Sequence, residues 1–298
     1  MTCTLCPRLC AAERTPARGD GYCRMPAGLR VARAALHQWE EPPISGTRGA
    51  GAVFFSGCTL RCCYCQNGRI SAGGQGKDIT PRRLREIFDE LIAQGAHNIE
   101  LVTATHFLPW ILPALEPRLP VPVVYNCGGY EKVETLRQLE GKVQIYLPDL
   151  KYVSEEAAWR YSHARNYFAV ATAAIREMFR QTGPYEMDET TGLLKKGVII
   201  RHMILPGMTE DSKRIIDWVA ENFAPGQVLF SLMRQYVPCG QAKEGKYPEI
   251  GRPLAEEEYQ EVEDYLFQSP IEDGFVQEAG SADSQFIPPF DGTGIKKV

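Results

Sequence analysis

The chain has 298 residues, of which 44% are hydrophobic and 23% charged, and its formal net charge is −4. This length allows one large or two small domains with a sizeable core, and scattered Lys and Arg in an acidic chain disfavour nucleic acid as a partner. No stretch approaches the roughly 18 apolar residues of a membrane span, and no export signal opens the chain. We therefore expect a cytoplasmic protein without a membrane segment. In that compartment ten cysteines favour metal or cluster chemistry over disulfides.

The first part of the chain contains four cysteines in a C-x2-C-x3-C-x12-C pattern, interrupted by prolines and glycines. The segment is too polar to bury a core of its own, and a metal is the simplest way to fold it. Its thiols suit either a structural zinc site or a second, fully coordinated iron–sulfur cluster, and the tight spacing slightly favours a cluster. The ligands would be Cys3, Cys6, Cys10 and Cys23. The alternative is a loose tail with incidental cysteines. We predict a Cys-rich metal-binding extension over residues 1–45.

A second group of cysteines follows the apolar run Ala52 to Phe55, which we interpret as a buried strand. Cys58, Cys62 and Cys65 have C-x3-C-x2-C spacing, and three thiolates on one loop suit an iron–sulfur cluster. Three protein ligands would leave one iron of a four-iron cluster open to an outside ligand. We expect Cys63 to be a small packed thiol. Zinc or a disulfide knot is the alternative, but structural zinc usually takes four ligands from paired knuckles, and the second pair is missing nearby.

This loop resembles the radical S-adenosylmethionine (SAM) superfamily, in which an aromatic residue normally precedes the third cysteine, as Tyr64 does here. The stretches EEPPISG at 40–46, SGCTLRCCYCQN at 56–67 and IRHMILPG at 200–207 are similar to the PflX-type branch, relatives of pyruvate formate-lyase activating enzyme. The resemblance implies a [4Fe–4S] cluster with SAM on its open iron. In this superfamily the reduced cluster cleaves SAM to methionine and a 5′-deoxyadenosyl radical, which abstracts hydrogen from a substrate.

Strands and helices alternate along the rest of the chain. We predict strands at 52–55, 99–102, 121–125, 143–147, 198–205 and 228–233, and helices at 80–95, 110–119, 133–139, 155–162, 167–181 and 211–223. Such alternation predicts a parallel sheet with right-handed crossovers. The fold class is therefore α/β, and the spacing favours a partial (β/α)6 TIM-like barrel over residues 46–250, the radical SAM barrel that the resemblance also implies.

The C-terminal part begins with a loop at 236–253 that is rich in Gly, Pro and Lys, of the kind that covers a site. A helix at 256–267 follows, and we expect the tail, with Phe286 and Phe290, to pack back on the barrel. We assign residues 251–298 to this part. Before it, the sixth strand ends in candidate substrate or adenine contacts, Ser231, Arg234 and Gln235.

Polar side chains follow the second and third strands, at the edge where barrel enzymes place their chemistry. Activating enzymes of the resembled superfamily usually carry here a glycine-rich motif ending in glutamate, which holds the SAM amino group. This chain lacks that motif, so we predict that Thr103 and Thr105 offer hydroxyls and carbonyls instead. His106 is either a site residue or a histidine satisfied near the barrel mouth. Asn126 can donate or accept a hydrogen bond to ligand, or it belongs to a plain strand-to-helix turn.

Charged residues end the fourth strand and interrupt the fifth. Asp149 and Lys151 alternate along extended chain and point to the same side. The resembled enzymes have Asp-Leu-Lys at the matching place, which implies a contact of Lys151 with the SAM carboxylate; an ion pair with Asp149 is the alternative. Arg201 and His202 lie in an apolar strand, where a charge is costly unless it is paired or bound to ligand. The resemblance implies that both approach the SAM ribose and carboxylate, with a structural salt bridge as the alternative for Arg201.

Three functions remain open at this stage. By resemblance, the substrate is a glycine of a partner glycyl-radical enzyme, and the electron donor is a flavodoxin or ferredoxin. The second hypothesis is a radical SAM enzyme that acts on a small molecule or peptide, which the missing glutamate motif and the N-terminal cysteines both allow. The third is a non-catalytic zinc-binding protein, which would contain no iron and cleave no SAM.

Overall fold

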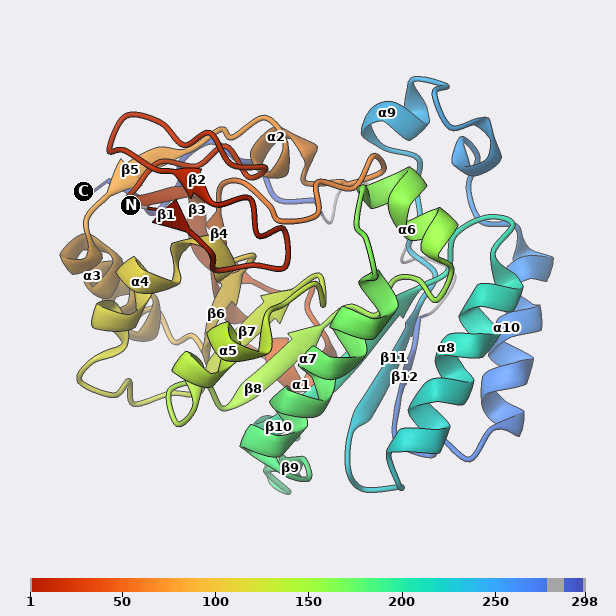
Figure 1. The fold of residues 1–298 in the computed structure, drawn as a ribbon. Coiled ribbons are helices and arrows are strands. Elements are labelled where there is room, and N and C mark those ends of the chain that lie inside the picture. Colours follow the sequence, from red (N-terminus) through yellow and green to blue (C-terminus); the bar gives the residue numbers. More distant parts are fainter. Residues whose placement is uncertain (1, 278–286, 297–298) are drawn as a thin grey trace.

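The computed structural model describes residues 2–277 and 287–296. In this part of the chain one ten-stranded sheet organises the molecule, with the strand order β12-β11-β10-β8-β7-β6-β4-β3-β5 and β9 paired to β10 (Figure 1). A separate two-stranded sheet, β1 (Thr2–Cys3) and β2 (Ala12–Glu13), lies in the N-terminal segment. The large sheet is open, since its order ends in two different strands, β12 and β5.

The middle of the large sheet is parallel. The strands of the whole large sheet are β3 (Leu29–His37), β4 (Ala50–Phe55), β5 (Lys77–Ile79), β6 (Ile99–Val102), β7 (Val123–Cys127), β8 (Ile145–Pro148), β9 (Glu186–Met187), β10 (Leu194–Met203), β11 (Leu229–Met233) and β12 (Gly274–Val276). The six predicted strands correspond to β4, β6, β7, β8, β10 and β11, and all run parallel. They are easy to recognise in the sequence because strands covered on both faces are near-continuous apolar runs.

The main sheet has four strands beyond the six that were predicted, namely β3, β5, β9 and β12. β12 pairs in parallel with β11, so the structure has seven parallel strands among the described residues where the sequence predicts six. β12 has only three residues and starts with Gly274, and it therefore lacks the apolar run that marks a buried strand. At the other edge, the nine-residue β3, which is not among the six predicted strands, runs antiparallel to β4 and β5.

Helices alternate with the strands. The connections after β6 and β7 each consist of a short α-helix and one or more 3-10 turns instead of one long helix. The helices are α1 (Pro42–Ser45), α2 (Gly68–Ser71), α3 (Pro81–Ala93), α4 (Leu108–Ile111), α5 (Val133–Leu136), α6 (Glu155–Ser162), α7 (Tyr167–Thr182), α8 (Thr209–Asn222), α9 (Gly240–Lys243) and α10 (Glu256–Gln268), with 3-10 turns at Thr105–Phe107, Leu112–Leu115, Arg137–Leu139 and Pro248–Ile250. α3 begins as predicted, because Thr80 accepts a hydrogen bond from the Arg83 backbone and Pro81 occupies the first turn. Figure 1 shows α8 and α10 side by side near β11 and β12.

The inner face of the sheet carries two layers of side chains, an apolar layer around α1 and a polar layer above it. Ile44 of α1 packs with Val124, Ile145, Leu147 and Ile199, which are inward-facing residues of β7, β8 and β10. Side chains two residues further along each strand point to the same face. Those residues are Asn126, Asp149 and Arg201, together with Ser231 of β11. α1 thus closes the lower part of the interior, and the polar residues lie above it.

The main sheet crosses both of the predicted domain boundaries. β3, from the first predicted part, pairs with β4, and β12, from the last, pairs with β11. The division at 45/46 and 250/251 therefore stays a prediction. The tail packs on the sheet where it is described, with the Phe290 and Phe54 ring centroids 5.6 Å apart; Phe286 lies outside the described residues. No helix in the described ranges has both the length and the apolarity to cross a bilayer.

Candidate functional site

A cavity of about 590 Å³ lies at the carboxyl ends of the parallel strands. The strands contribute Thr103, Asn126, Asp149, Arg201 and Met233 to its lining. The loop after β4 contributes Cys58, Cys62 and Cys65, with Tyr64, Gln66 and Asn67. Because active sites of parallel α/β folds occupy this edge of the sheet, the cavity is the candidate active site.

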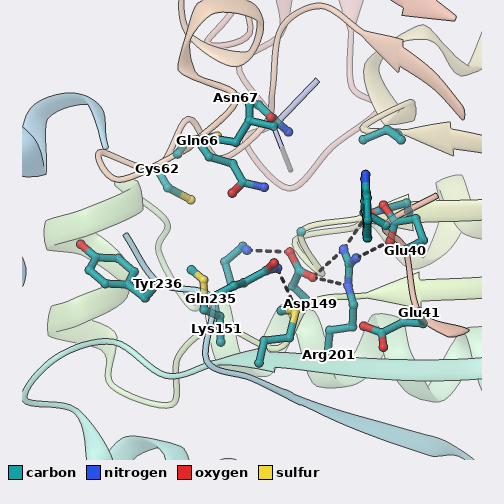
Figure 2. Close-up of a pocket in the computed structure, with 18 of the residues that line it drawn as sticks. Glu40, Glu41, Cys62, Gln66, Asn67, Asp149, Lys151, Arg201, Gln235 and Tyr236 are labelled. Atoms are coloured by element: carbon teal, nitrogen blue, oxygen red, sulfur yellow. Dashed lines mark hydrogen bonds and ion pairs between the residues drawn. The ribbon is translucent and has the colours of Figure 1, made fainter. Parts of the chain in front are cut away.

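Each of the three thiols of the loop accepts a hydrogen bond, and Cys58 Sγ accepts one from the Leu60 amide at 3.3 Å. The Ser162 hydroxyl donates to Cys62 Sγ at 3.0 Å, and the Ser71 hydroxyl to Cys65 Sγ at 3.4 Å. Burial raises the pKa of the Cys58 thiol to about 12 and also raises that of Cys65. These thiols therefore keep their protons until a metal displaces them. Figure 2 shows Cys62 pointing into the cavity.

The donor set fits a [4Fe–4S] cluster. Three thiols on one cavity wall, with hydroxyl donors to two of them, match the ligands and the sulfur hydrogen bonds that such clusters use. As they lie, the described His, Cys, Asp and Glu side chains form no group that could hold a metal ion. Cys63 instead is buried in the core cluster and does not line the cavity, as expected of a packed thiol.

An unsatisfied amide lies beside these thiols. Asn67 Oδ1 is buried and has no hydrogen-bond partner among the described residues, although the side chain lines the cavity. A buried acceptor without a donor costs free energy unless something else supplies one. An amino group of SAM is a suitable donor, so this side of the cavity fits the cofactor as well as the cluster.

An ionic network forms the wall opposite the thiols, with Arg201 at its centre (Figure 2). Its guanidinium pairs with Glu40 at 3.0 Å and with Asp149 at 2.8 Å, and it donates to Asn126 Oδ1 at 2.8 Å. Lys151 Nζ donates to the other oxygen of Asp149 at 2.6 Å. Burial raises the pKa of Asp149, but the two cations outweigh it and the net shift is downward. Asp149 is therefore ionised, and both predicted ion-pair alternatives, for Arg201 and for Lys151, are present in the structure.

Two acidic residues at the cavity, Glu40 and Glu41, were not predicted as site residues. Glu40 and Glu41 both line the cavity, and the Ser231 hydroxyl donates to Glu41 at 2.9 Å. Behind them, burial and the neighbouring Glu40 carboxylate raise the pKa of Glu100 well above its ordinary value. One sequence signal could have indicated these residues: Glu40 and Glu41 are adjacent acids directly before Pro42-Pro43. Burying two carboxylates costs free energy unless they meet a cation.

Three of the predicted residues do not line the cavity. His202 points to the opposite face of β10, where its ring contacts the Leu150 carbonyl at 2.7 Å and the Ser212 hydroxyl of α8 at 2.8 Å. Its neighbour Arg201 faces the cavity, so the alternation along a strand excludes His202. Thr105 donates to Glu131, and His106 contacts the Ser56 carbonyl at 2.7 Å; both are buried in the 3-10 turn after β6. Of the residues proposed for the SAM amine, Thr103 alone reaches the cavity.

Of the remaining predicted residues, some line the cavity and the others lie outside it. Tyr64 and Asn126 line the cavity, and the Tyr64 hydroxyl is 2.5 Å from that of Tyr152. Gln235 also lines it, whereas Arg234 pairs with Glu256. The four N-terminal cysteines lie elsewhere, and none of them lines the cavity.

A pH prediction follows from Glu131, whose Oε1 accepts from Thr105 while Oε2 has no partner among the described residues. Burial raises its pKa from 4.5 to about 8. Between these values the folded protein binds a proton that the unfolded chain lacks, so stability falls as pH rises. Replacing Glu131 with Gln should improve the free energy of unfolding relative to wild type by up to about 1.4 kcal/mol per pH unit. Urea denaturation from pH 5 to 8 tests this, and parallel pH profiles would contradict it.

Gly129 supplies a second prediction. It has φ +76°, and a Cβ there would lie 2.2 Å from the Asp149 carbonyl oxygen. Gly141 has φ +77° with no atom within 4 Å, so it is a matched control. Gly141→Ala should cost about 1–2 kcal/mol for its left-handed backbone, and Gly129→Ala should cost clearly more because the backbone below Asp149 must move. Equal thermal shifts of the two variants would refute the close contact.

The fold and the site together define an iron–sulfur protein with its three-thiol loop at the carboxyl edge of a parallel α/β sheet. Residues 52–219 match the family model of the radical SAM superfamily, and the chain belongs to that superfamily. It is a radical SAM enzyme, which implies a [4Fe–4S] cluster and SAM as cofactors.

Known proteins are similar to this chain at different levels. It is 28% identical over 275 residues to the uncharacterized protein MJ0674 of Methanocaldococcus jannaschii, covering 89% of this chain and 73% of the relative. SuiB of Streptococcus suis bound to S-adenosylmethionine has a TM-score of 0.50 and 12% identity, over 76% of this chain and 49% of SuiB. SuiB bound to its precursor peptide SuiA gives the same score over 47% of SuiB. The chain thus spans about half the length of SuiB, and at this identity the likeness shows the fold alone.

Proposed function

We propose that this enzyme uses SAM to abstract a hydrogen atom from a small molecule or a peptide segment that enters the cavity. One observation carries the proposal: a single cavity has three thiols on one wall and a charged network on the other. Its volume, about 590 Å³, lies within the usual range for sites that enclose small ligands.

The chain's own residues have distinct tasks in this proposal. The bound cluster and SAM would supply the radical. Asn67 Oδ1 accepts from an amino group, and Lys151 offers a cation beside Asp149 to a carboxylate. Arg201 is already matched by Glu40 and Asp149, so its task is to hold the wall in place. Tyr236 and Val237, from the predicted covering loop, line the cavity and help to exclude water.

The comparisons support the small-molecule or peptide function in a limited way. SuiB is a protein of the same fold that has been seen with SAM and with a precursor peptide. A peptide segment in the cavity of the present enzyme is consistent with that likeness and is proposed by analogy of fold alone.

Activation of a glycyl-radical enzyme is the second candidate, favoured by the resemblance of EEPPISG, SGCTLRCCYCQN and IRHMILPG to activating enzymes. In that case the entering segment is a glycine loop of a partner protein, with flavodoxin or ferredoxin as electron donor. None of the relatives described above is named as an activating enzyme, and the cavity itself does not identify a partner.

The test is to reconstitute the enzyme without oxygen, add dithionite and SAM, and measure 5′-deoxyadenosine. Extract of the source organism is then added as three fractions: small molecules, peptides and intact proteins. Stimulation by either of the first two supports the proposal. Stimulation by intact protein alone, with a glycyl-radical signal in that protein by electron paramagnetic resonance (EPR), would favour the second candidate. Absence of the nucleoside under every condition would refute radical chemistry.

A further inference from the structure

We propose that Cys3, Cys6, Cys10 and Cys23 bind a second iron–sulfur cluster, and that this cluster clamps the N-terminal segment onto the loop of the radical cluster. Four thiolates would coordinate every iron, so this site differs from the first in having no open position for SAM. The proposal goes beyond the function proposed above and does not depend on the substrate.

The backbone brings the thiols together. β1 pairs with β2 so that Cys3 lies opposite Ala12. Gly21 lies next to Ala12 and Cys10, because a Cβ on it would be 3.1 Å from Ala12 Cβ and 3.0 Å from Cys10 Sγ. Cys23 follows two residues later, in a turn closed by a hydrogen bond from the Arg24 amide to the Gly21 carbonyl. The pairing of β1 with β2 and the contact of Gly21 with Ala12 therefore bring Cys3, Cys10 and Cys23 into the same part of the segment.

The thiols of this segment accept backbone hydrogen bonds of the same kind as those of the radical-cluster loop. Cys6 Sγ accepts from the Arg8 amide and Cys23 Sγ from the Met25 amide, in each case two residues further along the chain. Cys58 Sγ of the radical-cluster loop accepts in the same way from the Leu60 amide. All ten cysteines of the chain are free thiols, so no disulfide accounts for the gathering.

The backbone beside these cysteines resembles that of the radical-cluster loop. In the described residues, seven non-glycine residues have a left-handed backbone. Leu9 and Ala11 flank Cys10, and Arg24 follows Cys23, with φ of 43°, 45° and 59°; in the radical-cluster loop Arg61, with φ of 54°, precedes Cys62. Such conformations persist where the surroundings over-determine them. Bonds from four cysteines to one cluster would do so here.

The tight spacing of the first three cysteines favours a cluster over a single zinc ion. As they lie, the described His, Cys, Asp and Glu side chains form no group that could hold a metal ion, and this holds for both sets of thiols. In addition, the Arg14 guanidinium lies 4.0 Å from Cys3 Sγ, where its charge would offset that of the thiolates.

Two residues between these cysteines, Arg8 and Tyr22, donate hydrogen bonds to the radical-cluster loop and its neighbourhood. Arg8 Nε donates to the Thr59 carbonyl at 2.7 Å, and its Nη2 donates to the Ser162 carbonyl at 2.7 Å. The Tyr22 hydroxyl donates to the Leu60 carbonyl at 3.1 Å, and the Arg8 guanidinium stacks 3.8 Å from the Tyr22 ring. Ser162 is also the residue whose hydroxyl donates to Cys62.

This arrangement links the two sites mechanically. Arg8 lies between Cys6 and Cys10, and Tyr22 immediately precedes Cys23, so bonds to a cluster would fix both gripping residues. In Figure 1 the N-terminal segment, in red, lies close to the orange segment that follows β4. Loss of the N-terminal cluster should therefore loosen the backbone that carries the radical-cluster thiols.

The decisive experiment counts metal in the anaerobically reconstituted full-length enzyme. We expect about eight irons and eight sulfides per chain, and about four of each in a Cys58→Ala/Cys62→Ala/Cys65→Ala variant, because a four-iron cluster would remain at the N-terminus. SAM should leave the EPR spectrum of the reduced variant unchanged, since no iron is open. About four irons in wild type and none in the variant, or one zinc per chain, would overturn the proposal. This variant leaves the N-terminal segment intact, and the count does not depend on SAM cleavage.

Two further variants test the clamp. Cys3→Ala/Cys6→Ala should lower the iron content to about four, whereas Cys239→Ala, a cysteine of neither set, should keep about eight. Arg8→Met keeps all four thiols and should also keep about eight irons, but limited proteolysis should cut its N-terminal segment at least several-fold faster than in wild type. An unchanged rate of cutting would refute the clamp, and a loss of iron in Cys239→Ala would refute the ligand assignment.

Discussion

Replacing Cys62 with Ala should reduce SAM cleavage to background and remove about four irons per chain, because three thiolates are the fewest that hold a four-iron cluster with one open position. Cys62 lines the cavity and accepts a hydrogen bond from Ser162, so its thiol has both the position and the environment of a ligand. The same loss is expected for Cys58→Ala and Cys65→Ala. Iron and sulfide analysis, together with 5′-deoxyadenosine formation under dithionite, measures it.

The adjacent thiol supplies a matched control. Cys63 is buried in the core, away from the cavity, and its amide donates to the Tyr161 carbonyl at 2.8 Å. Cys63→Ala removes the same chemical group one position away, and it should keep the iron content and the rate of nucleoside formation near those of wild type. If Cys62→Ala retains SAM cleavage, or if Cys63→Ala loses it as completely, the ligand assignment is wrong.

Replacing Arg201 with Met should destabilise the protein by about 3–5 kcal/mol, because the loss of one partner leaves buried charges uncompensated. The Arg201 side chain is 12% exposed, and its partners Glu40 and Asp149 are 11% and 15% exposed. Urea denaturation of the anaerobic protein measures the change in the free energy of unfolding. Adding Glu40→Gln should recover part of the loss, because one of the two carboxylates that lose their contact with Arg201 becomes neutral.

Arg180 is the control for this prediction. It also pairs with two carboxylates, those of Glu140 and Glu177, but its side chain is 52% exposed. Exposed pairs contribute at most about 1 kcal/mol, and the buried Glu177 keeps its hydrogen bond from Gln181 at 2.9 Å, so Arg180→Met should have a small effect. If Arg201→Met costs no more than Arg180→Met, the ionic wall of the cavity is not a structural element.

The sequence was most informative where the signal is local. The six central strands are near-continuous apolar runs, and α3 has both its capping threonine and its first-turn proline. Where local signals are weak, the prediction was incomplete. β12 is a three-residue strand beginning with glycine, and its pairing with β11 depends on residues about 45 positions away in the chain.

In the candidate site, too, the sequence predicted what depends on local spacing and missed what depends on contacts between distant residues. The strand pattern indicated that Asp149 and Lys151 share a side, since residues two apart in a strand do so. It did not select Arg201 over its neighbour His202, because that choice depends on which face the helices cover. The acids that neutralise Arg201 and Lys151 include Glu40, 161 positions from Arg201, and no local rule joins residues so far apart.

By itself, the sequence determined the order of the six central strands and of the helices between them, the spacing of the three loop thiols and hence the chemistry that these thiols can perform. Periodicity and ligand spacing act over a few residues, so they can be recognised without the fold. The tertiary structure decided which side chains meet in the cavity, that α1 closes its lower end, and that Arg8 and Tyr22 hold the cysteine loop. Those contacts form only when the sheet curves and brings distant segments together.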